Sequence, residues 1–352
     1  MPSRFNPEML VIARGARGLS QSDVASGMKW SQGKASKVEH GLIDLSQGEV
    51  TRLSDLLRFP ADLFYQYDAI RGFGTCCLYH RKRTTTPIRA LNQLHDSINV
   101  WRIQIRRLLA GVSLPNEVNF PCMDIDEFKE PEVVAQMLRA AWALPRGPIK
   151  NLANIVEAAG GIIFDVNLNT PKIDAVSQRA VGMPPIFFLD PTKPADRCRF
   201  TLAHEIGHIV MHRTPSPNAE AEADRFAAEF LMPARDIERD LRNLTIPKAA
   251  TLKLQWRVAM QAVIRRARDL GAISNSAYQS LCVRISQLGY RKNEPNPIQP
   301  EFPTALRQLI NVYLDSRGYS VAELSETMLC REDEFRELYL HDGPINQLRV
   351  IK

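Results

Sequence analysis

The sequence predicts a mainly α-helical protein of several domains with one small β-sheet in its middle part. Apolar residues recur at helical spacing over most of the chain. Short apolar runs typical of strands occur at 161–166 and 185–190, with a weaker run at 173–177. Proline-rich stretches at 214–217 and 294–303 interrupt the helices. A chain of 352 residues, 45% of them hydrophobic, can bury more than one core, so two or three domains are expected.

The first predicted domain, residues 1–66, contains two short helices joined by a tight turn. A helix with a periodic apolar pattern precedes them and contains Met9, Leu10, Ile12 and Ala13. Ser20 and Asp23 form a capping box that starts the first helix of the pair, and the turn follows at 27–30. The second helix spans 31–39 and ends at a His-Gly pair, where glycine suits a left-handed stop.

This pair fits a helix-turn-helix, whose second helix enters the major groove of DNA. Glutamine can read an adenine edge, and lysine can bind guanine or a phosphate. The predicted DNA-binding residues are Gln21, Ser31, Gln32, Lys34, Ser36 and Lys37. The predicted core of the domain consists of Leu19, Val24, Ala25, Trp30, Val38, Leu42, Leu53 and Leu57.

Three segments of this domain, 18–25, 37–41 and 59–64, resemble XRE-type DNA-binding domains related to phage repressors. The resemblance covers residues 5–66. It implies a five-helix, lambda-repressor-like fold that binds a double-stranded DNA operator. The alternative is a generic helical bundle, or a protein-interaction version of the same fold.

Residues 67–124 are predicted to form a basic helical connector. Residues 71–110 hold eight basic side chains and one acidic, a net charge of +7, whereas residues 1–60 hold eight basic and six acidic. Beside a DNA-binding domain, such a charge would neutralise phosphates and release counterions. A helical pattern with mixed faces leaves two alternatives open, a surface that pairs two subunits in a homodimer or a solvated linker helix. The residues of that pattern are Arg102, Ile103, Ile105, Arg106, Leu108 and Leu109.

The sequence His-Glu-Ile-Gly-His, from His204 to His208, is the HExxH arrangement with which zinc peptidases hold a metal and activate water. The two histidines lie one helical turn apart on one face, so both imidazoles can reach one ion while Glu205 lies beside it. The flanking residues 196–212 read as one helix, with Asp196 as the expected capping residue.

A catalytic zinc keeps three protein ligands, so a third ligand has to come from nearby chain. Glu220, Glu222 and Asp224 on the next predicted helix compete for this role. We choose Glu220, because Asp224 then lies at i+4, where it can accept the distal N–H of a liganding histidine. Glu222 would point away and is expected to be a solvated charge. His212 lies at the end of its helix, where a cation would cap the helix dipole.

Two imidazoles and one carboxylate imply peptide hydrolysis without a covalent intermediate. Water activated by the metal has a pKa near roughly 7, and Glu205 would pass its proton to the leaving amine. The alternative is an ordinary amphipathic helix with two hydrogen-bonded histidines. The acidic helix that follows argues against this alternative.

The segments 199–212 and 220–233 resemble the ImmA/IrrE family of metallopeptidases, and the resemblance extends over residues 125–295. Members are soluble zinc endopeptidases of gluzincin type, and several cut a repressor of the helix-turn-helix class. The resemblance implies that His204, His208 and Glu220 bind the metal and that Glu205 is the general base. It fixes neither the substrate nor a residue that stabilises the transition state.

The metallopeptidase core is predicted at 125–233, with a helical extension at 234–295 and a helical tail at 296–352. Within the core we expect helices at 131–144 and 148–159 before the three strands. The weak strand is expected at an edge, where it could bind an extended peptide next to the zinc. The tail has no functional motif.

No apolar run is long enough to span a membrane, and no signal peptide is evident, so a cytoplasmic protein without a membrane partner is expected. The six cysteines, at 76, 77, 122, 198, 282 and 330, have no CxxC spacing and suit reduced thiols. These observations argue against a secreted digestive protease.

Two classes of function remain. The first is a DNA-binding transcription regulator that carries a zinc-dependent endopeptidase and cuts a repressor or another regulatory protein. The second is a regulator whose peptidase-like domain is a ligand sensor or dimerisation module without proteolysis. The intact HExxH motif favours the first, because a pure sensor has no need of Glu205.

Overall fold

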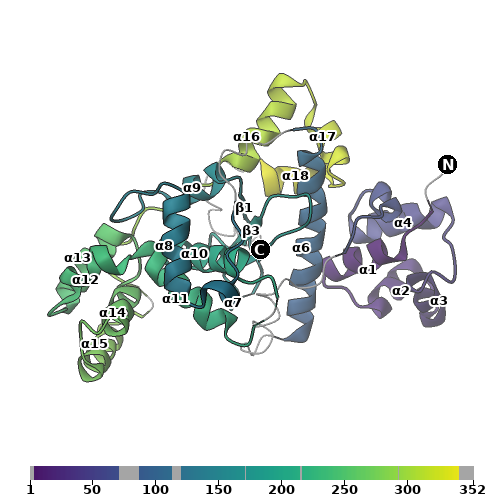
Figure 1. Ribbon diagram of the computed structural model, residues 1–352. Coiled ribbons are helices and arrows are strands. Elements are labelled where there is room, and N and C mark those ends of the chain that lie inside the picture. Colours follow the sequence, from purple (N-terminus) through teal and green to yellow (C-terminus); the bar gives the residue numbers. More distant parts are fainter. Residues whose placement is uncertain are drawn as a thin grey trace.

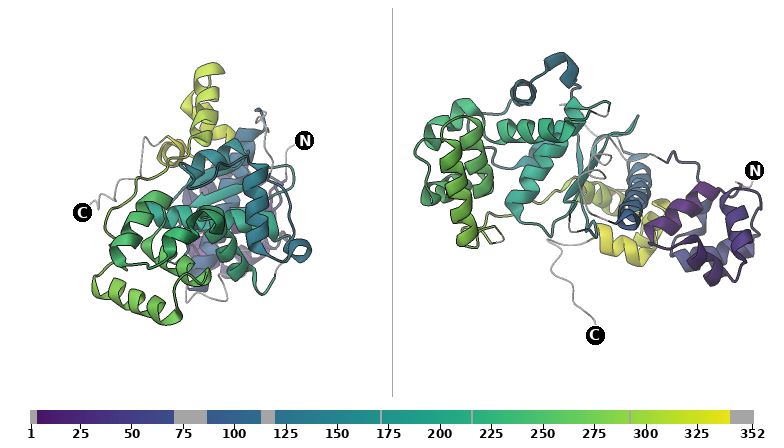
Figure 2. Two further views of the ribbon diagram at one scale, coloured as in Figure 1. Left: turned by 60° about the vertical axis from the view of Figure 1, so that its left-hand side comes forward. Right: turned by 90° about the horizontal axis from the view of Figure 1, so that it is seen from below.

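The computed structural model describes residues 4–70, 87–112, 120–170, 172–214, 216–291 and 293–340. The arrangement is elongated, with a helical bundle at the N-terminal end, a three-stranded sheet in the middle and the helices of residues 234–287 at the far end (Figures 1 and 2). The predicted fold class, mainly helical with one small sheet, is confirmed. In the described parts of the chain, no helix has the length and apolar content needed to cross a membrane.

The N-terminal bundle consists of four α-helices and a 3-10 helix, so the fifth predicted helix is a short 3-10 turn. These elements are α1 (Pro7–Ala16), α2 (Gln21–Met28), α3 (Gln32–Glu39), α4 (Gln47–Leu57) and η1 (Ala61–Tyr65). The predicted capping box is confirmed, since Ser20 Oγ accepts a hydrogen bond from the Asp23 N–H at 3.1 Å. The expected core is buried or half-buried except for Leu42. That residue is 73% exposed because it follows the end of α3 and points to solvent.

The long helix α6 (Ile88–Leu109) lies between the bundle and the sheet (Figure 1). Val100 and Ile103 pack into the core of the bundle, whereas Leu94 and Ile105 pack on the sheet side. The mixed apolar faces expected from the sequence are therefore buried within the chain.

Basic side chains of α6 are engaged inside the protein. Arg102 is buried and donates to the Ala69 carbonyl at 2.6 Å. Arg106 and Arg107 lie 3.0 and 3.1 Å from the Asp68 carboxylate. These three cations are thus not a free phosphate-binding surface. The basic residues at 71 and 81–83 lie outside the described residues, as do the cysteines at 76 and 77.

The sheet has the strand order β1-β3-β2. Its strands are β1 (Ile162–Asp165), β2 (Ala175–Gln178) and β3 (Ile186–Leu189). β1 and β3 are parallel and pair Ile162 with Ile186, whereas β2 and β3 are antiparallel and pair Ala175 with Leu189. The segment expected as an edge strand is therefore β2, at the edge next to β3.

Helices cover both faces of the sheet, which explains why all strand residues except Asp165 are buried. Ile163, Phe187 and Leu189 pack against the peptidase helices, and Phe164 and Phe188 pack against α6 and the C-terminal helices. The elements of that C-terminal part are α16 (Ala305–Asn311), the π-helical turn η2 (Val312–Ser316), α17 (Val321–Thr327) and α18 (Glu332–Tyr339). The tail thus closes the second face of the sheet.

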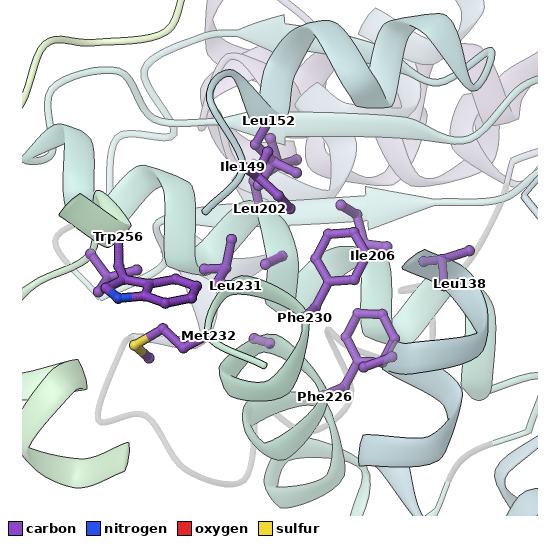
Figure 3. Close-up of a cluster of buried hydrophobic side chains, with 14 of the residues drawn as sticks. Leu138, Ile149, Leu152, Leu202, Ile206, Phe226, Phe230, Leu231, Met232 and Trp256 are labelled. Carbon is purple, nitrogen blue, oxygen red and sulfur yellow. The ribbon is translucent and has the colours of Figure 1, made fainter. Parts of the chain in front are cut away.

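The first face carries the largest core, in which α11 packs between α8 and α10 (Figure 3). Its helices are α7 (Ile125–Phe128), α8 (Pro131–Ala141), α9 (Leu152–Ala158), α10 (Ala195–Met211), α11 (Ala219–Leu231), α12 (Ala234–Leu241), α13 (Ile246–Trp256), α14 (Met260–Asp269) and α15 (Asn275–Gln287). α9 begins later than expected because the Asn151 side chain caps it.

The expected capping role of Asp196 is wrong. The N-cap is Pro194, and the Asp196 carboxylate is buried and paired with Lys253.

The terminal helix α18 also contacts the N-terminal bundle through charged groups. Arg17 donates to both carboxylate oxygens of Glu334, at 2.8 and 2.7 Å, and its guanidinium lies 4.0 Å from the centre of the Phe59 ring. Arg58 pairs with Asp333 in the same turn of α18. The bundle is therefore fastened to α18 as well as to α6.

Gly207 of α10 packs directly against Phe226 of α11. A Cβ placed there would lie 2.9 Å from Phe226 Cδ1, in a fully buried contact. We expect Gly207→Ala to lower the free energy of unfolding by about 1–3 kcal/mol, because overpacking has to push the helices apart. Urea unfolding would measure this loss. Gly48→Ala in α4, where a Cβ meets nothing within 4 Å, is the matched control and should be neutral or stabilising. Equal effects of the two changes would contradict this account of the α10–α11 contact.

Candidate metal centre and nucleic-acid interface

Two adjacent helices bring the predicted metal ligands together. His204 and His208 come from α10, and Glu220 comes from the first turn of α11. One donor atom of each of these residues lies within 4.8 Å of the others. The two Nε2 atoms are 3.0 Å apart, and Glu220 oxygens lie 3.3 Å from Nε2 of His208 and 3.8 Å from Nε2 of His204.

The opposite nitrogen of each ring already has a partner, and this decides what the Nε2 atoms can do. His204 Nδ1 lies 3.0 Å from Asp224 Oδ1, and His208 Nδ1 lies 3.0 Å from His212 Nδ1. When both Nδ1 atoms carry the proton and donate, both Nε2 atoms present lone pairs to the same point. Two lone pairs and a carboxylate facing one another fit a divalent cation, so the donor set suits a metal.

Asp224 holds the His204 ring and is itself held by Arg265 of α14, which lies 3.5 Å from Asp224 Oδ2. Burial disfavours the charged form of His204, but the hydrogen bond to Asp224 and the nearby carboxylates outweigh it and raise its pKa. Asp224 thus contacts the distal nitrogen of a candidate ligand histidine, the position expected from the sequence.

A second chain of contacts runs outward from His208. His212 Nδ1 faces His208, and His212 Nε2 lies 3.0 Å from Glu222 Oε2. Burial, together with His208 and His204, lowers the pKa of His212 to about 3, so its ring is neutral. His212 stands at the C-cap of α10, as expected, but as a neutral ring and not as a cation. The expectation of a solvated Glu222 is wrong, because this carboxylate accepts from a buried ring.

Glu205 is 1% exposed and points to the sheet. The Ser177 hydroxyl of β2 donates to Glu205 Oε2 at 2.5 Å. This hydrogen bond fixes one carboxylate oxygen and leaves the other as a proton acceptor. The sequence argument missed Ser177, since no motif links it to a glutamate 28 residues further on.

The predicted DNA-binding residues lie at the start of α2 and along α3. Gln32 donates to Gln21 at 2.7 Å, and Gln21 donates to Glu39 at 2.8 Å. Gln32 and Lys37 are exposed, and Ser31 is the N-cap of α3. Ser36 is half-buried.

Lys34 differs from the other predicted DNA contacts. Its ammonium donates to Glu49 at 2.6 Å and lies 5.1 Å from the centre of the Trp30 ring. The Lys34 contact and the Ser46 N–H lower the pKa of Glu49 to about 2, which keeps this pair charged. Lys34 therefore holds α3 against α4, and Lys37 is the more accessible cation.

Comparison with known families identifies two domains in the chain. The family described as an IrrE N-terminal-like domain matches residues 161–268, and a helix-turn-helix domain matches residues 10–64. The chain joins a helix-turn-helix domain to an IrrE N-terminal-like domain. No curated protein matches the chain.

The IrrE N-terminal-like domain contains the three strands, the HExxH helix and the acidic helix that follows, so every residue of the candidate metal centre lies inside it. The helix-turn-helix domain contains α2 and α3 and implies DNA binding. α6 and α16 to α18 lie outside both matched segments, yet they complete the packing around them.

Proposed function

We propose that this protein is a DNA-binding transcription regulator whose IrrE N-terminal-like domain is a zinc-dependent endopeptidase that cuts a repressor or another regulatory protein. The observation that carries the proposal is the convergence of His204, His208 and Glu220 on one point, beside a buried Glu205. Ligand sensing without proteolysis has no use for that glutamate.

The residues divide the chemistry among them. His204, His208 and Glu220 would hold the zinc, which would supply Lewis acidity to activate water near neutral pH and to polarise the scissile carbonyl. Glu205 accepts the proton of the attacking water and delivers it to the leaving amine. Ser177 orients Glu205 from β2, and Asp224 and His212 orient the two ligand imidazoles.

The position of β2 suggests how a peptide substrate is held. β2 is an edge strand of the described sheet, and its Ser177 contacts the general base directly. An extended peptide that adds to this edge by main-chain hydrogen bonds would pass next to Glu205, but all four residues of β2 are buried, so the edge has to open first. Such recognition depends little on sequence, so specificity comes from the shape of the partner around the cut.

Removal of the metal tests the proposal. Protein stripped by a chelator should cut none of the candidate repressors, and one equivalent of zinc per chain should restore cleavage. Binding to DNA should survive the treatment, because the helix-turn-helix domain contains none of the ligands. Cleavage that continues in the stripped protein would contradict the zinc mechanism.

The DNA half has its own test. We expect Lys37→Ala to weaken binding to mixed-sequence duplex DNA and to reduce the slope of log K against log salt by about 0.9, the loss of one phosphate contact. The control is Lys150→Ala, an exposed lysine of the peptidase half. An unchanged slope would remove α3 from the interface.

A regulator that senses a small molecule is the second candidate function. It is favoured by a large cavity outside the metal centre. The two functions are compatible in one chain.

A further inference from the structure

A cavity of about 830 Å³ lies among the described residues, away from the metal ligands. Its walls come from β1 and the loop after it, the start of α10, α6, the segment before α16, and α18. None of His204, Glu205, His208 or Glu220 lines it. This volume falls in the range of small-molecule sites, about 300–1,000 Å³.

One carboxyl group in the cavity wall lacks a donor. Oδ1 of Asp165, the last residue of β1, is buried and has no hydrogen-bond partner among the described residues. Burial, with the nearby Glu157 carboxylate as a second cause, raises the pKa of Asp165 to about 7. A buried carboxylate oxygen without a donor costs free energy, which a bound donor would recover.

The cations of the wall are already engaged. Arg17 is bound to Glu334, Arg199 is bound to Glu301, and Lys193 lies 3.2 Å from Asp190. Arg307 also has a partner in the chain. The charges of these cations are thus largely balanced within the chain, although Arg199 Nε has no partner among the described residues, whereas Asp165 Oδ1 faces no cation of the wall within hydrogen-bond distance.

The rest of the wall next to β1 is apolar. Trp101 of α6 packs edge-on against Phe164 with ring centres 5.9 Å apart, and Leu94 and Leu306 lie beside them. These side chains offer an apolar body a surface that excludes water.

We propose that this cavity binds a small amphipathic amine, with its apolar body on the wall of Trp101 and Leu94 and its ammonium group on Asp165. The site is separate from the metal centre and does not depend on proteolysis. It assigns to this chain a ligand class in addition to the DNA and peptide partners proposed above.

The cavity also touches the helix-turn-helix domain. Arg17 and Phe59 of that domain line it together with Glu334 of α18, the partner of Arg17. The cavity therefore extends to the groups that fasten the DNA-binding domain to the rest of the chain.

Calorimetric titration of the full chain with two matched probes tests the site. 4-Phenylbutylamine and 4-phenylbutyrate share one apolar body and differ in charge. The amine should bind at least about tenfold more tightly than the acid, as expected for a charge-assisted contact to a carboxylate. Equal binding of the two, or tighter binding of the acid, would overturn the proposal.

Two variants locate the binding. Asp165→Asn should reduce the affinity for the amine at least about tenfold, whereas Asp240→Asn, an exposed aspartate of α12, should leave it unchanged. Ser97→Phe fills the cavity from α6, leaves Asp165 in place and should also abolish binding. Amine binding that survives both Asp165→Asn and Ser97→Phe would place the ligand elsewhere. If Asp165→Asn does not fold, the Ser97→Phe variant alone decides whether the amine binds in the cavity.

Discussion

Glu205→Gln should reduce the rate of peptide cleavage about 10²- to 10⁴-fold, the range that a general base contributes. The amide keeps the shape of the side chain and can still accept the Ser177 hydrogen bond, but it cannot take a proton from water. Glutamine at this position leaves His204, His208 and Glu220 in place, so zinc content should stay at one per chain. Mass spectrometry of candidate repressors incubated with each protein measures cleavage, and elemental analysis measures the metal.

The control for this variant is Glu238→Gln, at an exposed position of α12. It removes the same charge without approaching the metal centre and should cut at the wild-type rate. Wild-type protein and Glu205→Gln acting alike on every candidate would count against proteolysis and favour ligand sensing as the role of this domain.

His212→Phe should weaken zinc binding about 10- to 100-fold, the usual effect of losing a group that orients a metal ligand. The phenyl ring fills the same buried space but offers no acceptor to His208 Nδ1, so the donor is left unsatisfied and the ligand ring is free to turn. Competition with a zinc-binding dye gives the affinity. Thermal unfolding of the metal-free proteins separates this effect from a general loss of stability.

Glu222→Gln is the companion variant. Its amide oxygen can still accept from His212 Nε2, so zinc affinity should change much less than in His212→Phe. Unchanged zinc binding in His212→Phe would show that the third histidine serves packing alone and plays no part in holding His208.

The sequence predicts those parts of the structure that depend on local spacing. His204 and His208 are one turn apart on any helix, and Ser20 and Asp23 can cap only the helix that follows them. Asp224 could be placed because it lies one turn from Glu220. In these cases the partners share one element or two consecutive ones.

The contacts that the sequence did not predict join elements distant along the chain. Ser177 meets Glu205 because β2 lies at the edge next to α10, which depends on the strand order. Glu222 meets His212 because α11 runs close beside α10, where Gly207 permits the approach. The role of the C-terminal tail could not be recognised from the sequence, because its apolar residues pack against the second face of the sheet, which is formed by strands far away along the chain.

α6 serves two cores at once, and this constrains how the halves of the protein can be separated. Val100 and Ile103 complete the core of the helix-turn-helix domain. Leu94 and Ile105 of the same helix belong to the core on the second face of the sheet. A fragment that stops at residue 66 would therefore expose to water the apolar side chains that α6 covers and should be prone to aggregate. Gene fragments or evolutionary fusions that keep the DNA-binding end intact are expected to carry residues up to about 109 with it.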